Sequence, residues 1–213
     1  MVVKVIIFDF DDTITDNKVL DLESFRYLSC SLGLYVPSMQ EITELRCKSL
    51  LAKDIISWMI EKSAKSVPLD LCMKMRDEFL KRKESEQLIR IKPNLHSVLR
   101  KLKSQGYVLL LATRTDIGRI KSILQSHKLA GFFKSVYANS SEDKSSIYLK
   151  ILHDLSLLPS ECLVVSNSFQ DLIPALTLAM KVVGIKGSYG IDQALFESVD
   201  VIEDLSELYA YTK

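Results

Sequence analysis

Two aspartates follow the first apolar segment of the chain. The run of β-branched and other apolar residues from Val2 to Phe8 ends at Asp9, and Asp11 lies two positions further on. Side chains two residues apart in an extended chain point in the same direction, so we expect both carboxylates to face one site. Carboxylates that converge repel each other and raise at least one pKa unless a cation lies between them. The pair therefore predicts a hard divalent ion with oxygen ligands, and Mg²⁺ is the ion most often found with phosphate.

Polar residues also follow two later apolar segments. They are Thr113 and Arg114 after the segment that ends at Ala112, and Asn167 and Asp171 after the segment that ends at Ser166. In an open α/β sheet, ligands bind beyond the carboxyl ends of the strands, near the point where the strand order reverses. We therefore expect these side chains to share one site with the two aspartates. A metal ion there would let a carboxylate approach an anionic phosphoryl group.

Buried strands and helices alternate in the part of the chain after Pro93. Short apolar runs, typical of strands buried on both faces of a parallel sheet, occupy residues 107–112, 135–138, 162–166, 182–185 and 199–202. Helices are expected between them, near residues 94–104, 117–127, 145–155 and 172–180, and at the end of the chain. Together with the first strand, this alternation predicts an α/β fold with a doubly wound parallel sheet and right-handed crossovers.

Residues 17–90 have a different pattern. Apolar residues recur there at helical spacing, almost nothing is typical of a strand, and Pro37 and Pro68 interrupt the pattern. We expect a compact bundle of roughly four helices, inserted between the first strand and the rest of the sheet. The predicted organisation is a core domain of residues 1–16 and 91–213 and an α-helical subdomain of residues 17–90.

The composition excludes several classes of protein. The 213 residues include 28 Lys plus Arg and 27 Asp plus Glu, a formal charge of +1, and 47% of them are hydrophobic. A nucleic-acid binder that depends on excess positive charge is disfavoured, and so is disorder. The glycines form no phosphate-binding or dinucleotide-binding loop, and the cysteines have no metal-site spacing. The first residues have neither the length of a membrane span nor the layout of a signal peptide, so we expect a cytoplasmic protein with reduced thiols.

Four motifs, in order, resemble those of the haloacid dehalogenase-like (HAD) superfamily. The pattern hhhhDxDxT, in which h is apolar, is matched by residues 5–13, and an apolar strand that ends in Thr is matched by residues 109–113. Lys144 is similar to the basic residue at the start of a helix, and Asn167 and Asp171 stand where the family has two acidic residues. The helical subdomain resembles the cap of the subclass that includes phosphoglycolate phosphatases and β-phosphoglucomutases. The resemblance covers essentially the whole chain.

The resemblance implies a role for each of these residues. Asp9 would attack phosphorus and form an aspartyl-phosphate, and Asp11 would protonate the leaving alcohol and later deprotonate water. Thr113 would hold the nonreacting phosphate oxygens, and Lys144 would neutralise their charge and orient Asp9. Mg²⁺ would be bound by the Asp9 carboxylate, the backbone carbonyl of Asp11 and the side chains of the fourth motif.

A helical cap implies a closed site that suits a small phosphorylated metabolite. Arg46 and Lys48 lie near the expected substrate loop of the cap, and Arg114 follows the phosphate-binding Thr113. These cations would recognise an anionic or hydroxylated leaving group, although Arg46 and Lys48 are equally consistent with surface cations. We expect no nucleic-acid or membrane partner, and either a monomer or a homodimer.

Asn167 departs from the family pattern because a neutral amide replaces a metal-binding carboxylate. The missing negative charge should weaken Mg²⁺ binding, so we hypothesise that Asp171 is the main acidic ligand of this loop and Asn167 a weaker one. The dehalogenase branch also carries Ser and Asn in this loop, but it lacks the acid/base aspartate that Asp11 provides. We therefore expect a Mg²⁺-dependent phosphatase. The alternatives are a phosphoryl mutase, a 2-haloacid dehalogenase, and a weakly active or noncatalytic binding protein of the same fold.

Overall fold

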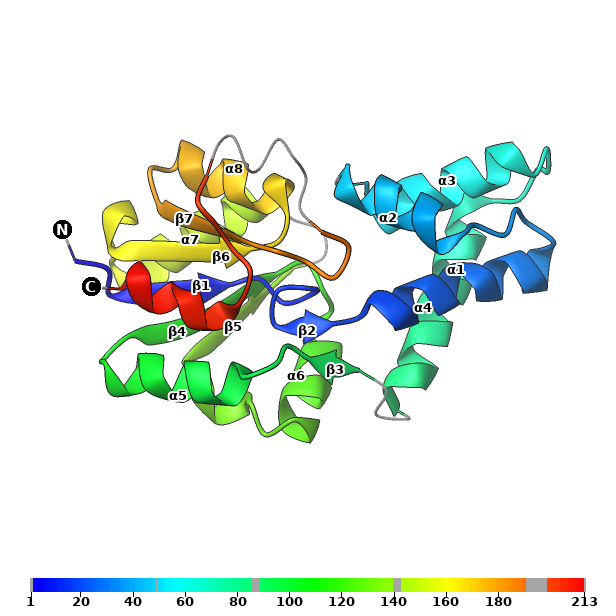
Figure 1. The fold of residues 1–213 in the computed structure, drawn as a ribbon. Coiled ribbons are helices and arrows are strands. Elements are labelled where there is room, and N and C mark those ends of the chain that lie inside the picture. Colours follow the sequence, from blue (N-terminus) through cyan, green and yellow to red (C-terminus); the bar gives the residue numbers. More distant parts are fainter. Residues whose placement is uncertain (1, 49, 86–88, 140–142, 191–198, 213) are drawn as a thin grey trace.

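A six-stranded parallel sheet forms the centre of the molecule. The computed structural model describes residues 2–48, 50–85, 89–139, 143–190 and 199–212. The strands are β1 (Val5–Phe8), β4 (Val108–Thr113), β5 (Ser135–Ala138), β6 (Cys162–Ser166), β7 (Lys181–Ile185) and β8 (Val201–Ile202). Their order is β5-β4-β1-β6-β7-β8, and every pair is parallel (Figure 1). This confirms the predicted α/β class.

The strand β1 lies between β4 and β6, where the strand order changes direction. Phe8, its last residue, pairs with Leu111 of β4 and with Val165 of β6, and all four side chains of β1 are buried. The polar residues that follow these three strands therefore leave the sheet side by side. This register is what brings the sequence motifs together.

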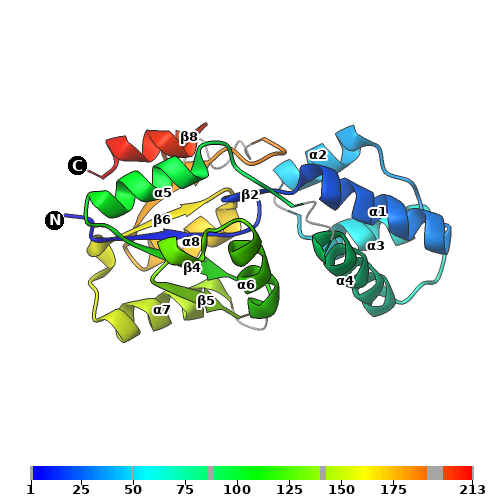
Figure 2. The same ribbon diagram turned by 90° about the horizontal axis from the view of Figure 1, so that it is seen from below.

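Helices cover both faces of the sheet. The core on one face contains residues of α5 (Leu95–Ser104) and α6 (Ile117–Ser126), and α7 (Lys144–Leu155) and α8 (Phe169–Thr177) pack on the other. Short 3-10 helices lie between these elements and after β8: η1 (Ala130–Phe132), η2 (Pro159–Glu161) and η3 (Leu205–Ala210), of which η3 contributes Leu205 and Leu208 to the core. Figure 2 shows the C-terminal segment beside α5. The expected terminal helix is thus a 3-10 helix, and the first and last strands are shorter than expected.

Four helices lie beyond the carboxyl ends of the strands, and we call them the helical cap (Figures 1 and 2). They are α1 (Lys18–Leu32), α2 (Met39–Cys47), α3 (Ala52–Lys62) and α4 (Leu69–Ser85). The cap has a hydrophobic cluster of its own, centred on Phe25, Ile42 and Met59, which are fully buried. Ser38 and Glu41 form a capping box that starts α2, because each side chain bonds the backbone amide of the other residue.

A two-stranded antiparallel ribbon joins the cap to the core, and the sequence did not predict it. Its strands are β2 (Thr15–Asp16) and β3 (Arg90–Ile91), and Thr15 pairs with Ile91. The two places where the chain enters and leaves the cap therefore lie next to each other. No helix in the described ranges is long and apolar enough to cross a membrane.

Candidate active site

The loop after β1 turns back on itself and presents its carboxylates to a cavity. The Asp9 amide continues the sheet by donating to the Val165 carbonyl (2.9 Å), and the amides of Ile14 and Thr15 both donate to the Phe10 carbonyl (3.2 and 3.3 Å). The cavity, of about 550 Å³, is lined by residues of the core and of the cap. Seven of the predicted site residues line it: Asp9, Asp11, Arg46, Thr113, Arg114, Asn167 and Asp171.

Asp9 is held by the buried ammonium group of Lys144. The Lys144 Nζ lies 2.7 Å from Asp9 Oδ1, 3.1 Å from Asp171 Oδ2 and 2.7 Å from the Ala112 carbonyl. Burial raises the pKa of Asp9 to about 7, against the lowering effect of Lys144. Burial alone would lower the pKa of Lys144, but the two carboxylates outweigh it and raise this pKa, so the lysine stays charged. The site therefore holds a fixed positive charge beside Asp9.

Three side chains orient Asp11. Its Oδ2 accepts a short hydrogen bond from the Thr115 hydroxyl, and its Oδ1 accepts one from Asn17 (3.2 Å) and lies 3.5 Å from Arg119. Its side chain is 41% exposed, so its carboxylate is open to the cavity. Thr115, Asn17 and Arg119 were missed in the sequence, although the position of Thr115 two residues after Thr113 is a signal for a side chain at the same strand end.

Thr113 and Arg114 lie at the end of β4. Thr113 is buried, and its hydroxyl accepts the Thr115 amide proton (3.1 Å), which fixes the start of the loop. Arg114 donates to Asp171 Oδ1 (3.2 Å) and lines the cavity. Asp171 therefore binds two cations, Arg114 and Lys144, and its Oδ2 also accepts from the Ser166 hydroxyl (3.1 Å).

The Thr13 hydroxyl links two side-chain oxygens of the kind that bind a divalent ion. It donates to Asp9 Oδ2 (3.4 Å) and to Asn167 Oδ1 (3.0 Å), so these two oxygens lie on either side of one hydroxyl. Carboxylate and amide oxygens are donors suited to Mg²⁺. Within the described ranges, no three His, Cys, Asp or Glu side chains are grouped to hold a metal. The hypothesis that Asp171 is the main acidic ligand gains no support here, because both of its oxygens engage cations.

A third acidic residue of the loop, Asp12, lies against Asn167. The Asn167 Nδ2 donates to Asp12 Oδ2 (3.4 Å), and the Ser188 amide donates to the same oxygen (2.8 Å). Burial raises the pKa of Asp12 to about 6. Asp12 has a φ of 61°, in the left-handed region, where Asp is tolerated more readily than most residues. Asn167 carries no negative charge itself, but the Asp12 carboxylate lies next to its side-chain amide.

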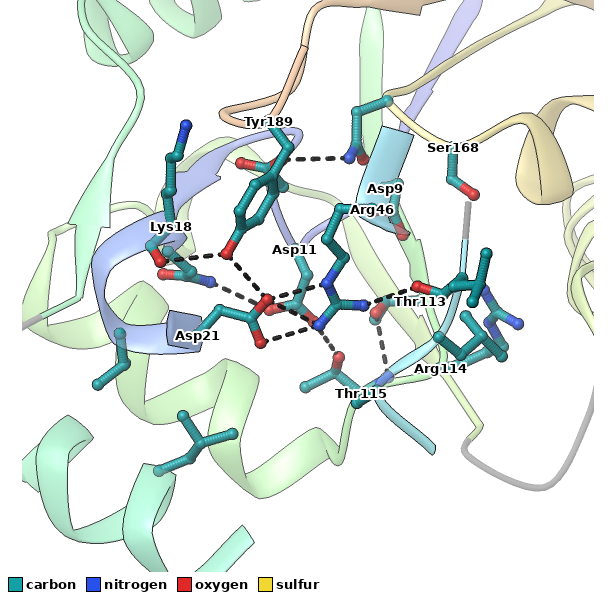
Figure 3. A pocket seen from close by; sticks show the side chains of 18 of the residues that line it. Asp9, Asp11, Lys18, Asp21, Arg46, Thr113, Arg114, Thr115, Ser168 and Tyr189 are labelled. Atoms are coloured by element: carbon teal, nitrogen blue, oxygen red, sulfur yellow. Dashed lines mark hydrogen bonds and ion pairs between the residues drawn. The ribbon is translucent and has the colours of Figure 1, made fainter. Parts of the chain in front are cut away.

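On the cap side of the cavity, two arginines share one buried aspartate. Arg46 binds Asp21 through Nε (2.9 Å to Oδ2) and Nη2 (2.7 Å to Oδ2 and 2.8 Å to Oδ1), and Arg76 Nη2 lies 2.5 Å from Asp21 Oδ1. Burial alone would raise the pKa of Asp21, but the two guanidinium groups outweigh it and lower this pKa. Figure 3 shows the Arg46 guanidinium group joined to Asp21 by dashed lines, and both side chains line the same cavity as Asp11 and Thr113. Lys48, by contrast, is exposed at the end of α2 and does not line the cavity.

The comparisons with known proteins agree with this arrangement. A family model described as haloacid dehalogenase-like hydrolase matches residues 6–185. The chain belongs to this family. Two curated HAD-family relatives are phosphoglycolate phosphatases of Psychrobacter arcticus, 26% identical over 56% of this chain, and of Mannheimia succiniciproducens, 24% identical over 72%. The matched part spans 54% of the length of the first relative and 72% of the length of the second.

Solved structures of HAD-like proteins share the fold. CbbY of Rhodobacter sphaeroides, solved in complex with phosphate, has a TM-score of 0.77 and 19% identity and covers 97% of this chain and 96% of its own. A predicted phosphoglycolate phosphatase of Haemophilus somnus has a TM-score of 0.79 and 21% identity and covers 99% and 98%. These matches extend over nearly the whole chain, so the similarity includes the cap as well as the core.

Proposed function

We propose that the protein is a Mg²⁺-dependent phosphatase that hydrolyses a small phosphomonoester through an aspartyl-phosphate on Asp9. The observation that carries the proposal is the environment of this carboxylate. Lys144 holds Oδ1, while Oδ2 and Asn167 Oδ1 both accept from the Thr13 hydroxyl, beside a cavity of about 550 Å³. A carboxylate held in this way is positioned to act as a nucleophile toward an anionic phosphoryl group.

The reaction proceeds in two transfers. An oxygen of Asp9 forms a bond to phosphorus as the bond to the leaving oxygen breaks, and Asp11 gives its proton to that oxygen. Asp11, now a carboxylate, takes a proton from water, which attacks phosphorus and returns Asp9 and inorganic phosphate. Thr113 and Lys144 stabilise the charge on the nonreacting oxygens.

Mg²⁺ would be held by the Asp9 carboxylate, the backbone carbonyl of Asp11 and the Asn167 side chain. When bound, it offsets the repulsion between Asp9 and the phosphoryl group. We propose that Asp171 orients Lys144 and Arg114 and is not the main metal ligand, because contacts with these two cations occupy its carboxylate.

A direct assay tests this function. The purified chain should release p-nitrophenol from p-nitrophenyl phosphate in the presence of Mg²⁺ and lose this activity in EDTA. The names of the curated relatives make phosphoglycolate the first natural substrate to compare, within a wider set of phosphorylated metabolites. Halide release from 2-haloacids would instead support the dehalogenase, and phosphate binding without turnover would support the noncatalytic protein. The cytoplasmic location and the monomeric or homodimeric state stay predictions from the sequence.

The metal site makes a prediction for Asn167→Asp. The new carboxylate would face Asp12, because the Asn167 amide nitrogen is 3.4 Å from Asp12 Oδ2. Without metal, the two like charges should lower the melting temperature, and with Mg²⁺ the added charge should lower the apparent Kd for the ion by about tenfold, or about 1.4 kcal/mol. Thermal melting across a Mg²⁺ titration measures both effects. An unchanged Mg²⁺ response would show that Asn167 is not a ligand.

Arg114 and Lys48 form a matched pair of cations that tests the cavity. Arg114→Ala should lower kcat/KM by about 10- to 100-fold, since a hydrogen bond to a charged group contributes about 1.5–3 kcal/mol. Lys48→Ala should leave kcat/KM within about twofold, because Lys48 lies outside the cavity. Steady-state kinetics with p-nitrophenyl phosphate compares them. Equal losses in the two variants would contradict the placement of the substrate.

A further inference from the structure

A tight turn, Gly187–Gly190, follows β7 and lies against the catalytic loop. Gly187 and Gly190 form an antiparallel bridge, and the Gly190 amide donates to the Gly187 carbonyl (3.1 Å). A Cβ on Gly187 would lie 2.6 Å from Asp12 Oδ2, so a larger residue there would have to displace the Asp12 side chain. Ser188 donates to Asp12 from its amide (2.8 Å) and from its hydroxyl. These contacts hold the turn in one place on the core.

From this turn, Tyr189 reaches across to the cap. Its hydroxyl lies 3.0 Å from Asp21 Oδ2 and 3.1 Å from the Lys18 carbonyl, and the Lys18 ammonium is 5.2 Å from the centre of its ring. The ring packs against the hydrophobic cluster of the cap, and the Cys47 thiol donates to the Tyr189 carbonyl (3.0 Å). Figure 3 shows the hydroxyl pointing at Asp21 and Lys18. Tyr189 thus belongs to the core domain but packs against the cap.

The Tyr189 hydroxyl completes the set of donors around Asp21. The carboxylate of Asp21 also accepts bonds from Arg46 and Arg76, and both guanidinium groups lie over the ring of Phe25, at 5.6 and 5.2 Å from its centre. Asp21 and both arginines belong to the cap, whereas Tyr189 belongs to the core. The bond between Tyr189 and Asp21 therefore exists only while the cap lies over the core, and any opening of the cap breaks it.

We propose that Tyr189 is a positioning residue that fixes the cluster of Asp21, Arg46 and Arg76 over the cavity when the cap closes. The chain of contacts runs from Asp12 in the catalytic loop through the turn and Tyr189 to Asp21. It couples the geometry of the nucleophile loop to the side of the cavity that faces the leaving group. The inference rests on the proposed function for its kinetic consequence, but cap closure itself does not depend on turnover.

Tyr189→Phe tests the proposal because it keeps the ring and removes only the hydroxyl. A lost hydrogen bond to a carboxylate should shift closure toward the open cap by about tenfold. KM for p-nitrophenyl phosphate and Kd for inorganic phosphate should both rise, by up to about tenfold, with kcat within about twofold. The radius of gyration from small-angle X-ray scattering should also increase. Tyr211→Phe, a partly buried tyrosine outside the cavity, is the matched control and should change none of these values.

A double variant separates positioning from general loss of structure. Asp21→Asn should raise KM at least as much as Tyr189→Phe, and the two changes together should raise KM by less than the product of the two single effects, because Asp21→Asn weakens the same bond that Tyr189→Phe removes. Multiplying effects, or a Tyr189→Phe protein with wild-type KM, phosphate affinity and scattering, would overturn the proposal. A wild-type chain without turnover would contradict the phosphatase, while scattering and phosphate binding would still decide the role of Tyr189.

Discussion

Asp9→Asn should abolish phosphatase activity and leave the fold intact. An amide cannot form the aspartyl-phosphate, so turnover should fall by at least about 10⁴-fold, as expected when a covalent nucleophile is removed. The folded structure should tolerate the change, because Asn has the same size and shape as Asp, and Lys144 keeps Asp171 as a charged partner (3.1 Å). Steady-state release of p-nitrophenol measures the loss, and acid quenching of wild type with ³²P-labelled substrate should trap label on the protein but none on the variant.

The control for this variant is Asp70→Asn, which makes the same chemical change at an exposed position of α4. It should retain full activity and stability within about 0.5 kcal/mol. Activity in Asp9→Asn equal to that of the control would mean that another residue is the nucleophile. Because all three proteins are purified in the same way, the comparison also accounts for any contaminating phosphatase.

Lys144→Met should lower both activity and stability. The Lys144 side chain is 2% exposed and its ammonium group contacts both Asp9 and Asp171, so its removal leaves two buried carboxylates without their shared cation. Breaking a buried ion pair in this way costs about 3–5 kcal/mol of unfolding free energy. Activity should fall about 10²- to 10³-fold as well, because a preorganised positive charge is lost from the transition state. Urea unfolding and steady-state kinetics measure the two effects.

Lys150→Met is the matched control, on the same helix as Lys144. Its ammonium is exposed and pairs with Asp154 one turn away (3.2 Å), a contact of the kind that contributes little to stability. Unfolding free energy should change by less than about 0.5 kcal/mol, with normal activity. A Lys144→Met protein as stable as this control would show that Lys144 does not neutralise the two aspartates in the folded chain.

The parts of the site that could be predicted from the sequence are those fixed by strand ends. Asp9, Thr113 and Asn167 lie at or just after the ends of apolar runs. Neighbouring parallel strands place such residues side by side, whichever side chains they go on to contact. The short, nearly continuous apolar runs also identify the sheet itself, since a strand buried on both faces has no alternation of apolar and polar residues. The order of motifs along the chain is therefore enough to predict the fold class, and seven of the nine predicted site residues line the cavity.

The contacts made by side chains could not be predicted in the same way. Asp171 could bind either a metal ion or a positively charged side chain, and the choice depends on residues that come from other loops. In this structure it binds Lys144 and Arg114. Tyr189 and Asp21 are 168 positions apart, and neither belongs to a recognisable motif. The ribbon of β2 and β3 is too short to show any periodicity, because each strand has two residues.

That ribbon has a consequence for how such a protein changes over time. Because Thr15 pairs with Ile91, the chain leaves the core and returns to it at adjacent points. The helical cap is therefore an insertion whose two ends are held together by the ribbon. The entropic cost of closing a loop rises only slowly with the length of the loop, and the hydrophobic cluster of the cap offsets that cost. The length, sequence and shape of the cap can be exchanged without altering the sheet. The residues of the core that would act on phosphate can therefore stay the same while the cap, and with it the choice of substrate, changes.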